Sequence, residues 1–427
     1  MKKNFSNSNS FLKKVLKVIP LGSQTFSKSH VQYPENLSPL FLQKGQGSRV
    51  WDMDGNVFID LVNGLMSNVL GYNDEAVNKA IVSQLNRGIS FSLPTELEYT
   101  LANLLIQIIP CAEMVRFGKT GTDVTSAAVR LSRAYTQRDK VLVCGYHGWQ
   151  DWYIGTTTRN LGVPKTVSAL TDVVPYNDLN TLENLLKTRE YAAFIMEPVN
   201  LFEPAVGYLQ SVRQLTQQHG TVLVFDEIVT GFHFALGGAQ EYFGVTPDLA
   251  CFGKGLGNGM PISAIVGKSE IMKLMDAIFF SGTFGGEALS LAAGIAVIEK
   301  MQQEPVINHL WHFGKELADE LQSLIQTYDL TQVIKLNGYA PWKILTFHDA
   351  DNISSSAIRT FLQKEMIENG ILMLTTHNIS YAMNHHDREE IIRAYDNSLG
   401  KLRESLMNNS LLADLECPIV QSIFKVR

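Results

Sequence analysis

Cysteine is scarce in this chain of 427 residues, and its four cysteines lie far apart. Cys111, Cys144, Cys251 and Cys417 show neither CxxC spacing nor the Cys/His spacing of a metal site. This pattern argues against a disulfide framework and against a zinc site, and it is typical of a reducing compartment. We therefore expect a cytoplasmic protein without a bound metal.

An excess of positive charge and a long apolar run are also missing. The formal net charge is −6 and the sequence pI is near 6.0, whereas nucleic-acid and anionic-membrane partners require concentrated positive charge. No segment reaches the ~20 apolar residues of a membrane span, and Lys13, Lys14 and Lys17 interrupt what would be the apolar region of a signal peptide. We expect a small-molecule substrate, with no nucleic-acid or membrane partner.

The central part of the chain alternates apolar runs with helical patterns. The runs are VLVC at 141–144, AAFIM at 192–196, TVLVF at 221–225, DLACF at 248–252 and ISAIV at 262–266. Between them, segments such as DVTSAAVRLSRAY carry apolar residues at helical spacing. This alternation predicts an α/β fold with a mostly parallel sheet covered by helices.

The flanks of the chain have a different pattern. Asp54-Gly55-Asn56 between WDM and VFIDL is a strong signal for a hairpin turn, and the region after about 315 mixes helices with short strands. The first residues read as a polar tail that leads into a short amphipathic helix. We predict a large α/β domain over 71–315 and a smaller α+β domain built jointly from segments 1–70 and 316–427.

Lys254 is the first candidate for chemistry. It follows the apolar run DLACF and lies within FGKGLGNG, so its amine emerges at a strand end among residues with almost no side chains. A partly desolvated lysine has its charged form disfavoured, and a neutral amine can attack an aldehyde. The alternative is a solvated lysine in a flexible glycine loop.

Asp226 is the second candidate, because it follows the buried run TVLVF at the edge where ligands bind in open α/β sheets. A carboxylate beside a pyridine nitrogen keeps that nitrogen protonated, and the protonated ring stabilises a neighbouring carbanion. The alternative is that Asp226 and Glu227 together cap the next helix.

Two further turns carry hydroxyl groups ahead of helices. Thr120, Gly121 and Thr122 come just before the helical pattern DVTSAAVRLSRAY, a position that suits a phosphate. Thr283 lies in the glycine-rich run SGTFGG, which also precedes a helical pattern. The alternative for the first turn is an ordinary N-cap with an acidic first turn.

Tyr146 and His147 follow the strand VLVC at the same sheet edge. The tyrosine ring is suited to stacking on a flat cofactor, and the alternative is a packed loop tyrosine. The conjunction of lysine, aspartate, hydroxyl turn and tyrosine in one region makes the separate structural explanations much weaker.

With these motifs, the chain strongly resembles the class III (fold type I) aminotransferases, which depend on pyridoxal 5′-phosphate (PLP), and most closely their glutamate-1-semialdehyde aminomutase branch. The most specific stretch is FDEIVTGFHFALGGAQEYFGVTPDLACFGKGLGNGMP at 225–261. RFGKTGTDVTSAAVRLSRAYTQRDK, YHG, MEPV and SGTFGGEALSLAAG supply the other family motifs.

The resemblance implies a role for each candidate. Lys254 would hold PLP as a Schiff base, and Asp226 would pair with its ring nitrogen. The chain would be a homodimer with shared sites. Further implied contacts are Ile228 and Tyr146 on the two ring faces, Thr120, Gly121 and Thr122 at the phosphate, His147, Glu197 and Asn200 in the hydrogen-bonding layer around the cofactor, and Thr283 at the phosphate of the neighbouring subunit.

Two departures from the aminomutase pattern concern the substrate. Where aminomutases carry a carboxylate-binding arginine, the run GSQTFS leads to Lys28, which is a point charge and not a bidentate fork. Where they carry a glutamate in a Phe-Glu-Ala-Gly-Phe stretch, this chain has TTHNISY, with His377, Asn378 and Tyr381. These side chains suit the hydroxyl groups of a larger acceptor, or alternatively only satisfy backbone groups.

The function predicted from the sequence is therefore a PLP-dependent aminotransferase that cycles through pyridoxamine 5′-phosphate. It would move an amino group from a donor such as L-glutamate to a keto or aldehyde acceptor. One rival is the intramolecular aminomutase. The other, from a different class, is a PLP-binding regulatory protein without turnover.

Overall fold

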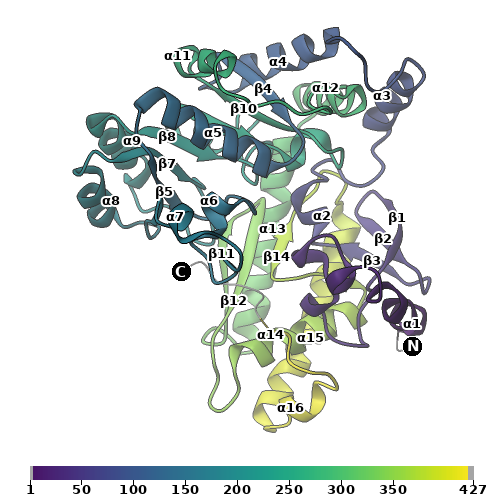
Figure 1. Cartoon of the computed structure of the whole chain (residues 1–427). Coiled ribbons are helices and arrows are strands. Elements are labelled where there is room, and N and C mark those ends of the chain that lie inside the picture. The colour runs from purple at the N-terminus through teal and green to yellow at the C-terminus, as the bar shows by residue number, and fades with distance from the viewer. Residues whose placement is uncertain (1–2, 422–427) are drawn as a thin grey trace. The chain divides into compact units, whose positions relative to one another are not determined.

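The computed structural model describes residues 3–421 (Figure 1). These residues form two compact units. Unit 1 comprises the chain up to Asp74 and from Asn308 onward, and unit 2 comprises Glu75–Ile307.

Unit 2 is built on a seven-stranded sheet in the order β4-β10-β9-β8-β7-β5-β6. Neighbouring strands from β9 to β6 are parallel, and only β10 runs antiparallel to both of its neighbours. The prediction of a mostly parallel α/β sheet is therefore confirmed. The strands are β4 Met114–Gly118, β5 Lys140–Cys144, β6 Thr171–Val173, β7 Tyr191–Met196, β8 Val222–Asp226, β9 Leu249–Phe252 and β10 Ser263–Gly267.

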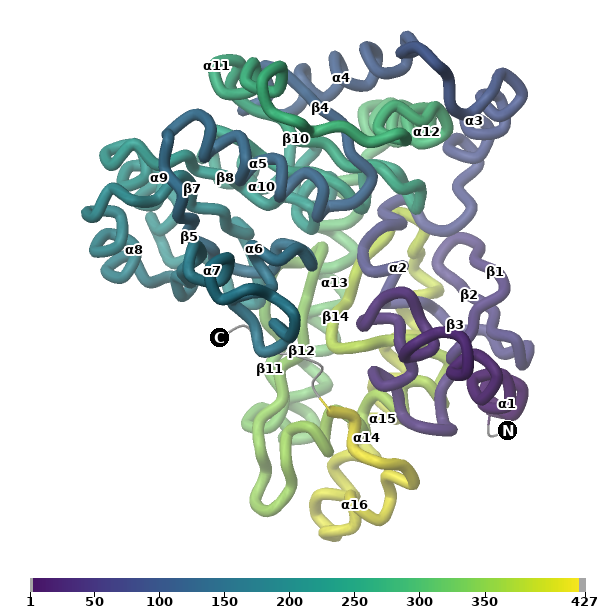
Figure 2. Tube along the Cα trace, viewed as in Figure 1, coloured from purple at the N-terminus to yellow at the C-terminus, as the bar shows by residue number. Residues whose placement is uncertain are grey.

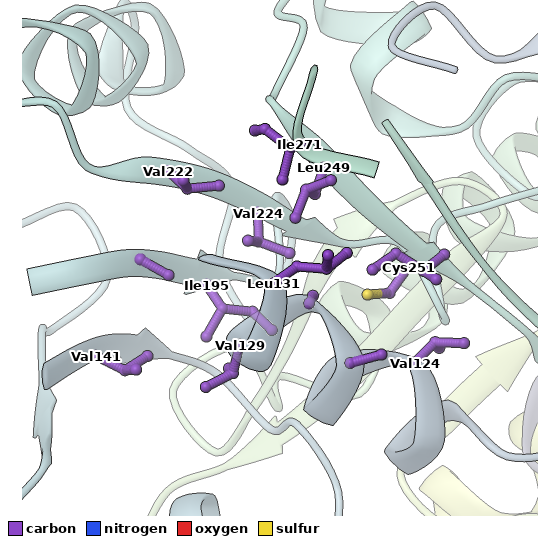
Figure 3. Close-up of a cluster of buried hydrophobic side chains, with 14 of the residues drawn as sticks. Val124, Val129, Leu131, Val141, Ile195, Val222, Val224, Leu249, Cys251 and Ile271 are labelled. Carbon is purple, nitrogen blue, oxygen red and sulfur yellow. The ribbon is translucent and has the colours of Figure 1, made fainter. Parts of the chain in front are cut away.

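The central strands are buried on both faces, which explains why their sequences read as continuous apolar runs and not as alternating ones. Every residue of β7, β8, β9 and β10 is buried. One face of this sheet packs against α5 (Gly121–Thr136), whose Val124, Val129 and Leu131 meet strand residues such as Ile195 and Val224 in Figure 3.

Among the other helices of unit 2, α4, α9 and α11 also contact strands of the sheet. Helices α8 and α9 lie side by side (Figure 2), and α12 packs against α3 and α4. Their bounds are α3 Glu75–Leu85, α4 Glu96–Ile108, α6 Asp151–Ile154, α7 Lys165–Ser168, α8 Leu179–Leu186, α9 Tyr208–His219, α10 Ala239–Phe243, α11 Ser269–Met272 and α12 Ala288–Gln303.

Unit 1 contains two small sheets, in the orders β1-β2-β3-β13 and β11-β12-β14. The expected hairpin at the Asp-Gly-Asn turn is present, since β2 and β3 pair antiparallel from Trp51 opposite Val57. The strands are β1 Leu42–Gln46, β2 Arg49–Asp52, β3 Val57–Asp60, β11 Ile334–Tyr339, β12 Trp342–Phe347, β13 Ile371–Leu372 and β14 Thr376–Asn378. The helices are α1 Ser6–Val15, α2 Asn63–Met66, α13 Val306–Thr327, α14 Ser355–Glu368, α15 His385–Met407 and α16 Leu411–Asp414. Within residues 3–421, none of the helices is long and apolar enough to cross a membrane.

The packing of α5 on the sheet gives a stability prediction. Val224 is 0% exposed in this core, whereas Val206, in the loop before α9, is 107% exposed. Val224→Ala removes buried methyl groups and leaves a cavity, so it should lower the free energy of unfolding of unit 2 by about 2 kcal/mol. Val206→Ala is the same substitution at a solvated site and should have almost no effect. Denaturant unfolding followed by tryptophan fluorescence measures both, and equal effects would contradict the assigned core.

Candidate functional site

Polar side chains gather where neighbouring strands of unit 2 end. Asp226 is the last residue of β8, Lys254 follows β9 by one glycine, and Glu197 directly follows β7. Tyr146 follows β5, the next strand of the same parallel set. Because the carboxyl ends of parallel strands meet at one edge, the sheet itself places these groups side by side.

Asp226 and His147 form a buried hydrogen-bonded pair. The distance between Asp226 Oδ2 and His147 Nδ1 is 2.8 Å, and the two side chains are 4% and 0% exposed. The second carboxylate oxygen accepts a hydrogen bond from the backbone N–H of Ile228 at 3.2 Å. These donors orient the carboxylate at the sheet edge.

The His147 ring is itself held from several sides. It stacks on Trp152, with ring centroids 6.4 Å apart, and meets the edge of Tyr153 at 5.3 Å. The Thr125 hydroxyl on α5 donates to the His147 carbonyl at 2.9 Å. Among the described residues, His147 Nε2 has no hydrogen-bonding partner.

Lys254 adopts a backbone conformation that a lysine rarely takes. Its φ is +42°, in the left-handed region that costs an ordinary residue about 1–2 kcal/mol. Burial lowers the pKa of its amine, while the charges of Glu197 and Asp226 act in the opposite direction. The strained backbone aims the side chain, and desolvation favours the neutral amine that nucleophilic attack requires.

Glu197 supports the loop that carries Tyr146. Its carboxylate accepts a hydrogen bond from the Tyr146 N–H at 3.0 Å. A Cβ on Gly145 would lie 2.3 Å from Glu197 Oε2, so the close approach requires glycine there. Burial, followed by the charge of Asp226, raises the pKa of Glu197 to about 7.

The turn at Thr120–Thr122 begins α5. The Thr120 hydroxyl accepts the Asp123 N–H and the Asp123 carboxylate accepts the Thr120 N–H, which is a capping box. The N–H groups of Gly121 and Thr122 belong to the first turn, where the helix offers no intrahelical partner. A Cβ on Gly121 would lie 2.4 Å from Ile228 Cδ1, so this glycine lets Ile228 lie directly against the turn.

The remaining predicted residues are divided between the two units. In unit 2, Thr283 is exposed in its turn, and Asn200 closes a local turn by accepting the Phe202 N–H. In unit 1, Lys28 is exposed, and His377 is buried with Nε2 2.6 Å from the Tyr395 hydroxyl.

Burial lowers the pKa of His377 to about 4, so its ring is neutral near pH 7. The Tyr381 ring lies edge-on to His309, and its N–H donates to the Val69 carbonyl. Asn378 is buried and donates through Nδ2 to the Val62 carbonyl at 2.7 Å, while its Oδ1 has no partner within residues 3–421.

Sequence reasoning missed two buried polar side chains. Asn63 follows Val62 directly and has an Nδ2 without a partner in the described part of the chain, and Leu65 and Met66 beside it have φ of 64° and 67°. His233 is buried, and its pKa is lowered to about 4, mainly by burial. The available signals were an Asn-Gly pair just after a strand and a histidine between two phenylalanines. In the described ranges no group of three or more His, Cys, Asp or Glu residues could hold a metal ion.

Three groups along this sheet edge carry the chemistry that a PLP-like group requires. An amine stands beyond β9, a fixed carboxylate ends β8, and free N–H groups begin α5. A Cβ on Gly253, the residue before Lys254, would make ordinary van der Waals contact with Ile228 at 3.7 Å, so Ile228 packs beside the backbone that carries the amine. This donor set matches an aldehyde, a pyridine nitrogen and a phosphate respectively.

Comparison with known proteins identifies the family of this chain. Residues 31–386 match the family described as aminotransferase class III. The chain is 33% identical over 381 residues to the 3-aminobutyryl-CoA aminotransferase of Cloacimonas acidaminovorans, covering 86% of this chain and 91% of that protein. It is 32% identical over 424 residues to the glutamate-1-semialdehyde 2,1-aminomutase of Fusobacterium nucleatum, covering 92% and 96%. The FumI protein of Sphingopyxis sp., solved in its PLP internal aldimine form, superposes with a TM-score of 0.86 at 26% identity, over 94% of this chain and 98% of that one.

The raised pKa of Glu197 gives a pH prediction for the PLP-free protein. Between the ordinary value of 4.5 and about 7, the folded chain keeps a proton that the unfolded chain has lost. Stability contributed by this group is therefore present below the ordinary pKa and is lost as the pH rises through the window, by at most about 1.4 kcal/mol per pH unit. Glu197→Gln cannot ionise, so it should lose less stability than the parent between pH 5 and pH 7. Denaturant unfolding at the two pH values tests this, with Glu183→Gln, at an exposed ion pair with Lys187, as the control. An identical pH dependence in parent and Glu197→Gln would contradict the prediction.

Proposed function

We propose that this chain, which belongs to the class-III aminotransferase family, is a PLP-dependent aminotransferase. It moves an amino group from a donor such as L-glutamate to a keto or aldehyde acceptor. The observation that carries the proposal is the pair of adjacent strand ends with Lys254 beyond β9 and the His147-bound Asp226 on β8. The family's small-molecule chemistry and its use of PLP support this reading of the two groups.

Each residue then has a defined task. When bound, PLP supplies an electron sink for the substrate carbon that loses its proton. Lys254 would hold the cofactor aldehyde through its amine, and when that amine is free it would carry the proton between the substrate α-carbon and cofactor C4′. Asp226 would pair with the ring nitrogen of the cofactor and keep it protonated, while His147 fixes the orientation of that carboxylate.

The binding groups surround these two residues. Gly121 and Thr122 bind the phosphate at the start of α5, and Ile228 and Tyr146 cover the two ring faces. Glu197 positions Tyr146 through the backbone contact at 3.0 Å. Thr120, His147 and Asn200 complete the layer of polar groups around the cofactor.

The active form is a homodimer in which Thr283 of each subunit reaches the phosphate bound by the other. Exposed apolar side chains on α3, on α4 and in the segment between them support this assembly, since large exposed apolar side chains are often buried in interfaces. These side chains are Val82, Leu85, Ile89, Phe91, Leu93 and Tyr99.

For the substrate, we propose that the acceptor carries hydroxyl groups and that Asn378, with Asn63, recognises one of them. Both amides are buried, and each has a polar atom without a partner among residues 3–421. Leaving a buried polar group unsatisfied costs about 1–3 kcal/mol, and Oδ1 and Nδ2 together complement a hydroxyl, which both donates and accepts. Lys28, His377 and Tyr381 are the further candidates in unit 1.

Relatives carry both aminotransferase and aminomutase names. Intramolecular amino transfer within glutamate-1-semialdehyde is therefore the second candidate function. Lys28 in place of the aminomutase arginine favours the aminotransferase, because a lysine lacks the bidentate grip on a carboxylate.

The role of Lys254 predicts where the cofactor is attached. Borohydride reduction of the PLP-loaded protein should fix the cofactor on Lys254, as peptide mapping would locate it. Lys254→Ala should lose amino transfer by several orders of magnitude, because both attachment and proton movement are removed, while its phosphate site still binds PLP. Lys268→Ala is the matched control, since Lys268 pairs with Asp248 away from the strand ends that carry the site. A reduced adduct on another lysine would disprove the assignment.

The acceptor proposal predicts a kinetic difference. With keto sugars as acceptors, Asn378→Ala should raise KM about tenfold, the loss expected for one or two hydrogen bonds, and leave the donor half-reaction nearly unchanged. Asn397→Ala, at an exposed asparagine on α15, should change neither. Efficient isomerisation of glutamate-1-semialdehyde, without transfer to any added acceptor, would overturn the aminotransferase in favour of the aminomutase.

A further inference from the structure

The segment that carries Thr283 is anchored at its beginning by arginines of the β4–α5 region. Arg130 on α5 donates to the Phe279 carbonyl at 2.5 Å, and Arg116 on β4 donates to the Phe280 carbonyl at 3.2 Å. The residues that follow, Ser281 to Phe284, are exposed. The segment therefore leaves the β4–α5 region from a fixed point and becomes solvated around Thr283.

The end of the segment is anchored by an ion pair to the same region. Lys119 Nζ lies 3.0 Å from Glu287 Oε2, and the two side chains are 20% and 11% exposed. Glu287 is also the N-cap of α12, where its carboxylate accepts the Leu289 N–H and the Ser290 hydroxyl, both at 2.6 Å. Because these hydrogen bonds hold the Glu287 carboxylate at the start of α12, the ion pair fixes the Lys119 ammonium to the same place.

Lys119 belongs at the same time to the turn that begins α5. The Asp123 carboxylate accepts the Lys119 N–H at 2.9 Å and the Thr120 N–H at 2.7 Å. The backbone of Lys119 is thus part of the capping arrangement of α5, while its ammonium reaches the cap of α12. One residue joins the turn of Thr120–Thr122 to the turn of Thr283.

We propose that Lys119 and Glu287 are a positioning pair that couples these two turns, so that the two sites of the homodimer load PLP cooperatively. The proposal rests on the proposed function, in which Thr120–Thr122 bind the phosphate of their own subunit and Thr283 binds that of the neighbour. A phosphate that orders the first turn then orders, through the pair, the turn that serves the second site.

Linkage makes the coupling reciprocal. If occupying one site favours the arrangement that the other site needs, each site raises the affinity of the other by the same factor. Removal of one partner of a largely desolvated ion pair leaves the charge of the other partner poorly compensated. A substitution at Lys119 or Glu287 should therefore disturb both turns. The expected consequence is weaker PLP binding together with a loss of cooperativity.

The test is a titration of the PLP-free dimer with PLP, followed by quenching of tryptophan fluorescence. The parent should give a sigmoidal curve, and Lys119→Met should raise the half-saturating concentration about tenfold and give a hyperbolic curve. Lys119→Arg keeps the charge and should keep both properties. Glu287→Gln retains an oxygen that caps α12 but loses the charge, so it should behave like Lys119→Met even if that variant folds poorly. Lys140→Met, which breaks the Lys140–Glu190 pair at the start of β5, should match the parent.

The outcomes distinguish the coupling between the two turns from the shared site of the homodimer, on which the coupling rests. Sedimentation of the parent and a weaker affinity in Thr283→Ala test the shared dimer without involving Lys119. If both hold but the parent curve is hyperbolic, or Lys119→Met keeps the sigmoidal shape of the parent, the coupling is wrong and the shared site stands. A monomeric parent, or a Thr283→Ala protein with unchanged affinity, overturns the shared site and the coupling with it.

Discussion

Burying a carboxylate without compensating donors costs several kcal/mol, and this constraint governs the edge of the large sheet. Asp226 ends a strand with no exposed residue, and its charge is met by the His147 ring and the Ile228 N–H. An ionised Asp226 can only accept, so His147 donates to it through Nδ1, and this hydrogen bond fixes the orientation of the ring. The contact also ties the loop after β5 to the end of β8, so the position of Tyr146 depends on the same pair.

The residues around the Asp226–His147 contact show how this buried charge is accommodated. Trp152 and Tyr153 are buried around His147 and exclude water from it. The neighbouring Glu197 and Lys254 are shifted in opposite directions by the same desolvation, since burial raises the pKa of the acid and lowers that of the amine. Both shifts reduce the charge that the site must hold, so a buried acid and a buried base coexist at one sheet edge.

Much of this could be predicted from local sequence, and the reasons for the exceptions are physical. Continuous apolar runs predicted β5, β7, β8 and β9, because strands covered on both faces need no polar positions, and residues that follow such runs come to the carboxyl edge automatically. The pairing of Lys119 with Glu287 could not be predicted, since the two residues are separated by 168 positions. Neither local sequence contains a signal that identifies the other residue as its partner. His377 reads as an available polar side chain, yet its place on β14 buries it against Tyr395. Asn63 was missed because burial, like that of His377, depends on tertiary packing. Only the structure shows that Asn378 hydrogen-bonds to Val62, next to Asn63, and that Asn63 Nδ2 has no partner among the described residues.

Unit 1 combines left-handed backbone at Leu65 and Met66 with two buried amides, Asn63 and Asn378, each of which has one polar atom without a partner among residues 3–421. Leu65 and Met66 each bear strain of about 1–2 kcal/mol, and each unsatisfied amide adds about 1–3 kcal/mol. A substitution such as Asn378→Leu would remove one of these costs without any need for a ligand, so stability alone gives no reason for an asparagine. Strain and unsatisfied polar atoms that occur together are characteristic of places where a bound molecule completes the hydrogen bonding. The proposed recognition of an acceptor hydroxyl by Asn378 and Asn63 would account for both features, because a hydroxyl group both donates and accepts hydrogen bonds.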